Sequence, residues 1–126
     1  MILEVNSINA GYLKSNILFD ISLKIEDGSC VSILGRNGMG KTTLIKSIMG
    51  IIPIKTGVIK FNRNKISGMP SHEISRLGIG LVPEGRHIFS NLTVKENLQT
   101  FYKTSHFISK KQWDLEKVLD LFPKLS

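Results

Sequence analysis

The sequence has few of the features that mark extracellular, fibrous or membrane-spanning proteins. Its 126 residues include one cysteine, Cys30, so no disulfide can form within the chain and a small disulfide-stapled fold is excluded. No apolar run approaches the roughly 18 residues of a spanning helix, and residues 1–6 lack the basic and apolar regions of a signal peptide. These absences predict a soluble, intracellular chain without a transmembrane segment of its own.

Acidic residues are outnumbered by basic ones. The chain has 10 Asp plus Glu against 17 Lys plus Arg, a formal net charge of +7. This balance fits a nucleic acid, an anionic membrane or a phosphate ligand, and equally a solvated basic surface. The lysines are scattered and form no basic stripe interleaved with aromatic residues, so a nucleic-acid partner is not expected.

Glycine is missing from the C-terminal part of the chain, since all 11 glycines lie at or before Gly85. Alternating apolar residues predict a strand marked by Ile17, Phe19, Ile21, Leu23 and Ile25. Further strands are predicted at residues 2–5, 57–61 and 79–82. Residues 30–34 form a short, nearly continuous apolar run, which is typical of a strand covered on both faces.

Helical spacing appears in three places. The first helix is marked by Leu44, Ile45, Ile48 and Met49. It should end at Gly50. Thr93 and Glu96 have the spacing of a capping box that starts a second helix, and Ser109 and Gln112 repeat the pattern for a third. Strands alternating with helices predict an α/β fold with a partly parallel sheet.

Residues 35–43 carry the strongest motif. They are Gly35, Arg36, Asn37, Gly38, Met39, Gly40, Lys41, Thr42 and Thr43, and they match G-x-x-x-x-G-K-[ST] in full. Glycines let backbone N–H groups turn inward onto phosphate oxygens, and the N-terminus of the following helix adds positive potential. Lys41 can reach the β- and γ-phosphates, and the Thr42 hydroxyl can ligate Mg²⁺. The alternative is a glycine-rich turn that happens to contain a lysine.

The residues in and around this motif resemble a known family. Gly11-Tyr12, residues 33–43, residues 57–59 and, most specifically, residues 81–98 (LVPEGRHIFSNLTVKENL) are similar to ATP-binding subunits of ABC transporters, of the type serving branched-chain amino-acid or urea uptake. The resemblance covers essentially all 126 residues. It implies an α/β P-loop NTPase fold, the ABC-type nucleotide-binding domain, with a truncated core sheet, an N-terminal antiparallel β portion and C-terminal helices.

The resemblance also implies roles for individual residues, with ATP and Mg²⁺ as cofactors. Tyr12 falls where the family stacks an aromatic ring on adenine; a strand-edge tyrosine packed on the core is the alternative. Lys41 and Glu84 fall at catalytic positions, and Thr42 and Glu84 at positions that hold Mg²⁺. Glu84 stands where most of the family has glutamine, and residues 83–85 are also ordinary turn composition.

The partners implied by the resemblance are membrane permease subunits and a second ATP-binding subunit. Residues 86–98 correspond to the region that meets the permease, where Arg86, His87 and Phe89 would be surface contacts; a solvated loop is the alternative. The expected location is therefore the cytoplasmic face of the cell membrane, as a peripheral subunit.

Several parts of the family's hydrolytic machinery have no counterpart in the sequence. The Walker B strand, the catalytic glutamate, the signature motif and the switch histidine are absent, and residues 66–70 only mimic the signature. Residues 1–126 are therefore predicted to be the N-terminal portion of a single ABC-type ATP-binding domain, with hydrolysis near background. Two functions stay open: an energy-coupling component of an importer, or a non-hydrolysing remnant that binds nucleotide or a partner.

Overall fold

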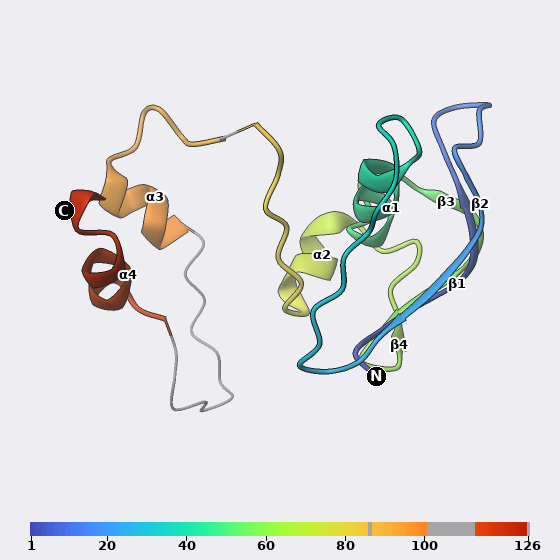
Figure 1. Cartoon of the computed structure of the whole chain (residues 1–126), viewed down its shortest axis with the longest axis horizontal. Coiled ribbons are helices and arrows are strands. Elements are labelled where there is room, and N and C mark those ends of the chain that lie inside the picture. Colours follow the sequence, from blue (N-terminus) through green and yellow to red (C-terminus); the bar gives the residue numbers. More distant parts are fainter. Residues whose placement is uncertain (86, 101–112, 126) are drawn as a thin grey trace. The chain divides into compact units, whose positions relative to one another are not determined.

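The computed structural model describes residues 1–85, 87–100 and 113–125 (Figure 1). The chain forms two compact units, Met1–Leu81 and Val82–Ser126. The first unit contains β1 (Leu3–Ala10), β2 (Leu18–Ile25), α1 (Lys41–Ile48), β3 (Ile54–Phe61), β4 (Asn64–Lys65) and α2 (Ser71–Arg76). The second unit contains α3 (Val94–Thr100), α4 (Leu115–Leu121) and the 3₁₀ turn η1 (Pro123–Leu125).

A four-stranded antiparallel sheet forms one layer of the first unit, in the order β2-β1-β3-β4. The central strand β1 pairs with both neighbours, and Leu3 lies opposite Ile25 on one side and Phe61 on the other. Along β2, Ile21, Leu23 and Ile25 alternate with exposed polar residues, because one face of the sheet is covered and the other is exposed to water. The predicted N-terminal antiparallel β portion and the strand over residues 17–25 are confirmed.

The core of the first unit lies between this sheet and α1. Its buried members are Val5, Ile8, Ala10, Leu18, Leu44, Ile48, Met49, Ile59, Ile66 and Ile74. The buried face of α1 carries residues at i, i+1, i+4 and i+5, namely Thr43, Leu44, Ser47 and Ile48, as expected for an amphipathic helix. The helix ends before Gly50, whose backbone is left-handed with φ 67°. The predicted helix is therefore confirmed.

In the second unit, α3 begins with the predicted capping box. The Glu96 carboxylate accepts hydrogen bonds from the Thr93 backbone N–H and hydroxyl, both at 2.8 Å, and the Glu96 N–H donates to the Thr93 hydroxyl at 3.2 Å. At α4, Asp114 is the N-cap and accepts from the Lys117 N–H at 2.9 Å. The predicted cap at Ser109 and Gln112 lies outside the described residues.

The capping box makes the stability of α3 depend on pH. The hydrogen bonds from Thr93, the backbone bond first, lower the pKa of Glu96 below its ordinary value of 4.5. A lowered pKa in the folded state contributes stability that is present above the unfolded pKa and is lost as the pH falls through the folded pKa. We therefore expect Glu96→Gln to reduce the acid-induced loss of helicity, followed by circular dichroism between about pH 6 and pH 3.

The matched control for this prediction is Glu116→Gln, in the first turn of α4. Glu116 is exposed, and its side chain makes no hydrogen bond within the part of the chain that the structure describes. Its acid titration should match that of the wild type. Identical curves for Glu96→Gln and the wild type would show that the capping box has no influence on acid stability.

Two predicted strands are wrong. Residues 30–34 and 79–82 form no strand, and Leu34 and Val82 are 91% and 94% exposed. Residues 30–34 are also not buried as predicted, since Val31 is 52% exposed. A strand needs a neighbour for its N–H and C=O groups, and within the described ranges no backbone hydrogen bond joins residues 30–34 to another segment. An apolar run alone therefore does not produce a strand here.

The sheet also differs from the prediction in its direction, because every strand pair among the described residues is antiparallel. The partly parallel sheet was predicted from the alternation of strands with helices, and the predicted strands at residues 30–34 and 79–82 do not form. Two elements were missed by the sequence analysis. They are the short strand β4, reached through a tight turn at Asn62 and Arg63, both with positive φ, and the helix α2.

Candidate functional site: the loop before helix α1

The loop that precedes α1 leads directly into the helix, so that Lys41 is the first helical residue. Gly40 is the N-cap with φ 89° and ψ 6°, and Gly38 has φ 85°. These left-handed conformations are closed to most residues but open to glycine. The Leu44 N–H donates to the Gly40 carbonyl at 2.8 Å. The N–H groups of the first turn of a helix point out of its N-terminal end, where they can bind an anion.

Lys41 folds back over the loop. Its Nζ donates to the carbonyl oxygens of Gly35 at 2.5 Å and Arg36 at 2.9 Å. The ammonium group is therefore held above the loop backbone, at the N-terminal end of α1. The positive charge of Lys41 therefore lies beside the partial positive charge of the N-terminus of α1.

The loop is fixed to the sheet at Gly40. A Cβ atom at this position would lie 2.8 Å from Leu18 Cδ2 and 3.1 Å from Ile17 Cγ2. The backbone of Gly40 therefore packs directly against the start of β2. Figure 1 shows the loop before α1 and the β1–β2 connection at the same end of the sheet.

Tyr12 lies in that β1–β2 connection and is 50% exposed. Its carbonyl accepts from the Ser15 N–H at 2.9 Å, which closes a turn. Lys55 of β3 reaches across, and its Nζ donates to Asn16 Oδ1 at 2.6 Å and to the Ser15 carbonyl at 3.3 Å. Tyr12 is thus an exposed residue of the β1–β2 connection, and not a residue packed in the core.

The contact of Lys55 with the β1–β2 connection was not expected from the sequence. It lies 39 residues after Asn16 in the sequence. No local pattern marks a contact over that separation, because it arises from the pairing of β1 with β3.

The other predicted loop residues differ in their exposure to solvent. Arg36, Asn37, Met39 and Thr42 are exposed, whereas Thr43 is 6% exposed and belongs to the buried face of α1. Of the two threonines, Thr42 therefore offers its hydroxyl at the surface. This position, directly after Lys41, is where the motif requires a metal-binding hydroxyl.

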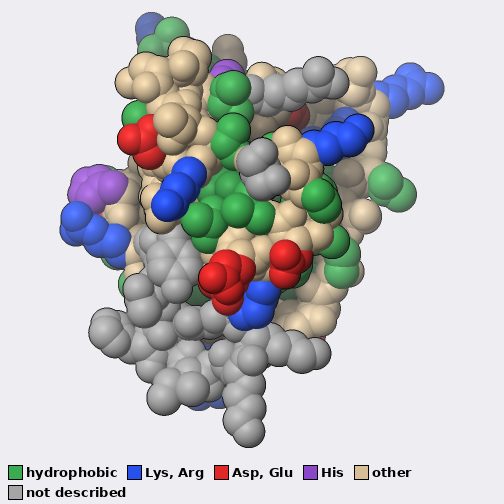
Figure 2. Space-filling model, turned by 90° about the vertical axis from the view of Figure 1, so that its left-hand side faces the viewer, with side chains coloured by type: hydrophobic (Ala, Val, Ile, Leu, Met, Phe, Trp, Pro, Cys, Tyr) green, Lys and Arg blue, Asp and Glu red, His purple; other side chains and the backbone are tan. Residues whose placement is uncertain are grey.

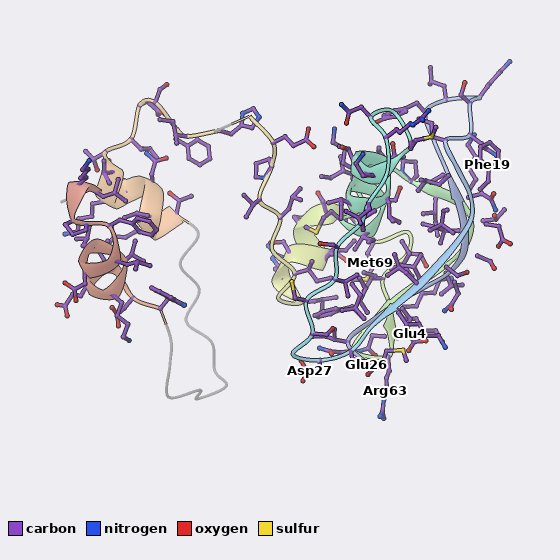
Figure 3. All side chains as sticks on the ribbon, viewed as in Figure 1. Glu4, Phe19, Glu26, Asp27, Arg63 and Met69 are labelled. Carbon is purple, nitrogen blue, oxygen red and sulfur yellow. The ribbon has the colours of Figure 1, made fainter. Side chains whose placement is uncertain are left out.

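Three acidic side chains of the first unit lie at the opposite end of the sheet from the loop. Figure 3 shows Glu4, Glu26 and Asp27 there, together with Arg63. The Glu26 carboxylate pairs with the N-terminal ammonium group at 3.1 Å. On the face drawn in Figure 2, Lys and Arg side chains are spread among acidic and hydrophobic ones. Lys41 and the N-terminus of α1 bring positive charge to the glycine loop.

Glu84, His87 and Phe89 lie in the second unit. Glu84 is exposed and lies at a bend with Gly85, which has φ 98°. His87 is exposed and Phe89 is 47% exposed. Arg86 lies outside the described residues. The roles of Glu84 and of residues 86–98 therefore stay predictions.

A glycine loop with two left-handed glycines, a lysine folded over it and a helix N-terminus are together the features of a P-loop. The family model for the ABC transporter matches residues 18–125. The chain therefore belongs to the ABC transporter family, and its fold is that of the ABC ATPases.

Similar curated proteins point the same way. A protein of Archaeoglobus fulgidus named "Probable branched-chain amino acid transport ATP-binding protein LivF" is 36% identical over 98% of this chain and 52% of its own length. The Pseudomonas aeruginosa "High-affinity branched-chain amino acid transport ATP-binding protein BraG" is 37% identical over 98% of this chain and 52% of its own. The chain spans about half the length of these curated relatives.

Solved structures agree on the fold. A structure described as the ATP-binding subunit of an ABC transporter matches 84% of this chain and 45% of its own, with a TM-score of 0.72 and 30% identity. A nucleotide-free ATP-binding cassette matches 77% of this chain and 38% of its own, with a TM-score of 0.66 and 29% identity.

Among the described residues, no helix combines the length and the apolar character needed to cross a membrane.

Proposed function

We propose that this chain serves as the ATP-binding, energy-coupling component of an ABC importer of the branched-chain amino-acid type. The observation that carries the proposal is Lys41, held over the glycine loop by Gly35 and Arg36 at the start of α1. Residues 1–126 are proposed to be the N-terminal portion of a single ABC-type ATP-binding domain. The relatives named for branched-chain amino-acid transport, similar over 98% of this chain, support this solute class.

ATP would bind through its phosphates at residues 35–43. The incoming β- and γ-phosphates would take the place of the Gly35 and Arg36 carbonyls as acceptors for Lys41. The exchange is favourable because an ionised phosphate oxygen is a stronger acceptor than a neutral carbonyl. The loop N–H groups and the N-terminus of α1 would bind the remaining oxygens.

Mg²⁺ fits the oxygen donors that the loop offers. The Thr42 hydroxyl would be its protein ligand next to the phosphates, since Mg²⁺ prefers oxygen ligands and keeps several waters. Glu84 is proposed as a second ligand and as a catalytic residue through its carboxylate. The ion supplies positive charge that neutralises the phosphates.

The proposed partners are membrane permease subunits, contacted through residues 86–98, and a second ATP-binding subunit. The chain would then lie at the cytoplasmic face of the membrane as a peripheral subunit. Exposed apolar side chains in this region, Ile88 at 76% and Phe89 at 47%, support a protein contact, because exposed apolar surface marks interaction sites.

Uptake by cells of the source organism tests the transport assignment. Cells that carry Lys41→Ala in place of the wild-type residue should lose uptake of labelled leucine, isoleucine and valine. Uptake of a sugar in the same cells is the control and should be unchanged. Equal branched-chain amino-acid uptake in both strains would contradict the proposed solute class.

Tyr12 is proposed to stack on the adenine ring, and its exposure in the β1–β2 connection allows this. We expect Tyr12→Ala to weaken ATP binding by about 1–3 kcal/mol, the usual contribution of base–aromatic stacking. Tyr12→Phe keeps the ring and should bind ATP like the wild type. Competition titration with a fluorescent ATP analogue measures both, and equal affinities for Tyr12→Ala and the wild type would exclude stacking.

A further inference from the structure

Asn97, in α3, holds the loop that precedes this helix. Its Oδ1 accepts the Phe89 N–H at 2.9 Å, and its Nδ2 lies 3.0 Å from the Phe89 carbonyl oxygen. The same Nδ2 lies 3.1 Å from the carbonyl oxygen of Leu92 and 3.0 Å from that of Thr93. One side chain thus binds both backbone polar groups of Phe89 and two further carbonyls of the loop.

The pattern of these bonds requires an amide. An asparagine side chain has one acceptor oxygen and two N–H donors, and Asn97 uses both kinds. Aspartate has nearly the same shape but has no donor when ionised, and its second oxygen would face three carbonyl oxygens. Asparagine is therefore required at this position for its N–H donors, since aspartate has nearly the same size but lacks them.

Asn97 is not needed to start α3, because the helix has its own cap. Thr93 and Glu96 supply the capping box. The bonds of Asn97 instead lead back to Phe89, eight residues earlier. These bonds therefore hold the loop before α3 rather than the helix itself. The apolar side chains of Ile88 and Phe89 are exposed on this loop.

We propose that Asn97 is a positioning residue that presents Ile88 and Phe89 for contact with the permease. This inference rests on the proposed contact through residues 86–98. An apolar contact on a loop is productive only if the loop is held in one conformation, because ordering it on binding would reduce affinity. The hydrogen bonds of Asn97 hold the loop in one conformation before the permease binds.

The first test follows the Phe89 amide hydrogen in the chain itself. Asn97→Asp removes the Nδ2 donors and places a carboxylate oxygen against three carbonyl oxygens, so the side chain should turn away from the loop and release the Phe89 N–H from Oδ1. We expect the Phe89 amide to exchange with solvent at least about tenfold faster than in the wild type. Asn91→Asp is the matched control. Asn91 is an exposed residue of the same loop, and its side chain makes no hydrogen bond within the described residues. Its substitution should leave the exchange rate unchanged.

The second test measures the partner contact in the assembled transporter. The complete ATP-binding subunit that carries this chain is co-expressed with the permease subunits of the source organism and purified through them in detergent. Asn97→Asp should reduce co-purification at least about fivefold, whereas its ATP affinity should stay within about twofold of the wild type. Asn91→Asp should co-purify like the wild type.

A double-mutant cycle separates positioning from a general structural defect. Phe89→Ala alone should also reduce co-purification, and adding Asn97→Asp to Phe89→Ala should reduce it little further. This result follows if Asn97 acts through the Phe89 side chain, since coupled residues do not add. Fully additive losses would show that Asn97 acts elsewhere and would overturn the inference.

The remaining outcomes distinguish the inference from the proposed function. Failure of the wild type to co-purify would overturn the permease contact, and this inference with it. Equal co-purification of the wild type and Asn97→Asp would overturn only the inference. An unchanged Phe89 exchange rate in Asn97→Asp would overturn it as well, because the loop would then not depend on Asn97.

Discussion

Lys41→Ala is expected to weaken Mg-ATP binding by about 100-fold. Two charge-assisted hydrogen bonds to phosphate contribute about 1.5–3 kcal/mol each, and each 1.4 kcal/mol corresponds to about tenfold in affinity. The loss should fall at the lower end of that range. Lys41 gives up its bonds to the Gly35 and Arg36 carbonyls when it binds phosphate, so the net gain is smaller than the sum.

The matched control is Lys46→Ala, in the last turn of the same helix. It removes the same charge from α1 at the end remote from the glycine loop, so ATP affinity should change by less than about twofold. Isothermal titration of wild type, Lys41→Ala and Lys46→Ala gives the three affinities. If Lys41→Ala binds Mg-ATP as tightly as the wild type does, Lys41 is not a phosphate ligand.

Gly40→Ala is expected to destabilise the first unit by about 2–5 kcal/mol. The left-handed backbone at φ 89° costs an L-residue about 1–2 kcal/mol. The new Cβ would also lie 2.8 Å from Leu18 Cδ2, and overpacking of a filled site typically costs about 1–3 kcal/mol. Leu18 is only 3% exposed, so its side chain has little room to move away.

Gly38→Ala is the matched control for the packing contribution. Gly38 has nearly the same backbone conformation, with φ 85°, but a Cβ there would have no neighbour within 4 Å. It should therefore cost about 1–2 kcal/mol, the backbone contribution alone. Urea unfolding of the three proteins measures the difference. Equal destabilisation by Gly38→Ala and Gly40→Ala would show that the loop does not pack on β2.

The parts of the molecule that the sequence predicted are those that local chemistry specifies. The glycine loop and α1 follow from the spacing of Gly40, Lys41 and the apolar face of the helix. The capping box at Thr93 and Glu96 forms with the predicted bonds because both residues lie within one turn. In these cases the partners are close in sequence, and the pattern alone determines the contact.

The incorrect predictions concern partners that are distant in sequence. Residues 30–34 have the composition of a buried strand, yet a strand exists only through pairing, and no described segment pairs with them. The contacts of Lys55 with Asn16 and of Asn97 with Phe89 depend on how the chain folds back, and neither has a local signal. The composition of a segment shows that it could form a strand, but it forms one only if another segment pairs with it.

Helix α2 was missed although its sequence carried signals. Glu73 lies in the first turn and Arg76 in the last, in agreement with the helix dipole. Gly78, with φ 104°, follows the C-cap Leu77, which is the usual place for a terminating glycine. With six residues the helix buries only Ile74, too little for an apolar periodicity to be recognised.

The dependence of affinity on the number of phosphates tests the central claim most directly. Competition titrations of this chain with ATP, ADP, AMP and adenosine, each with Mg²⁺, compare ligands that differ only in the groups that Lys41, the loop and the N-terminus of α1 would bind. Affinity should fall by about tenfold or more at each step from ATP to ADP to AMP, because charge-assisted bonds are lost with each phosphate. AMP or adenosine binding as tightly as ATP would contradict the account, since recognition would then lie in the base and not in the phosphate loop.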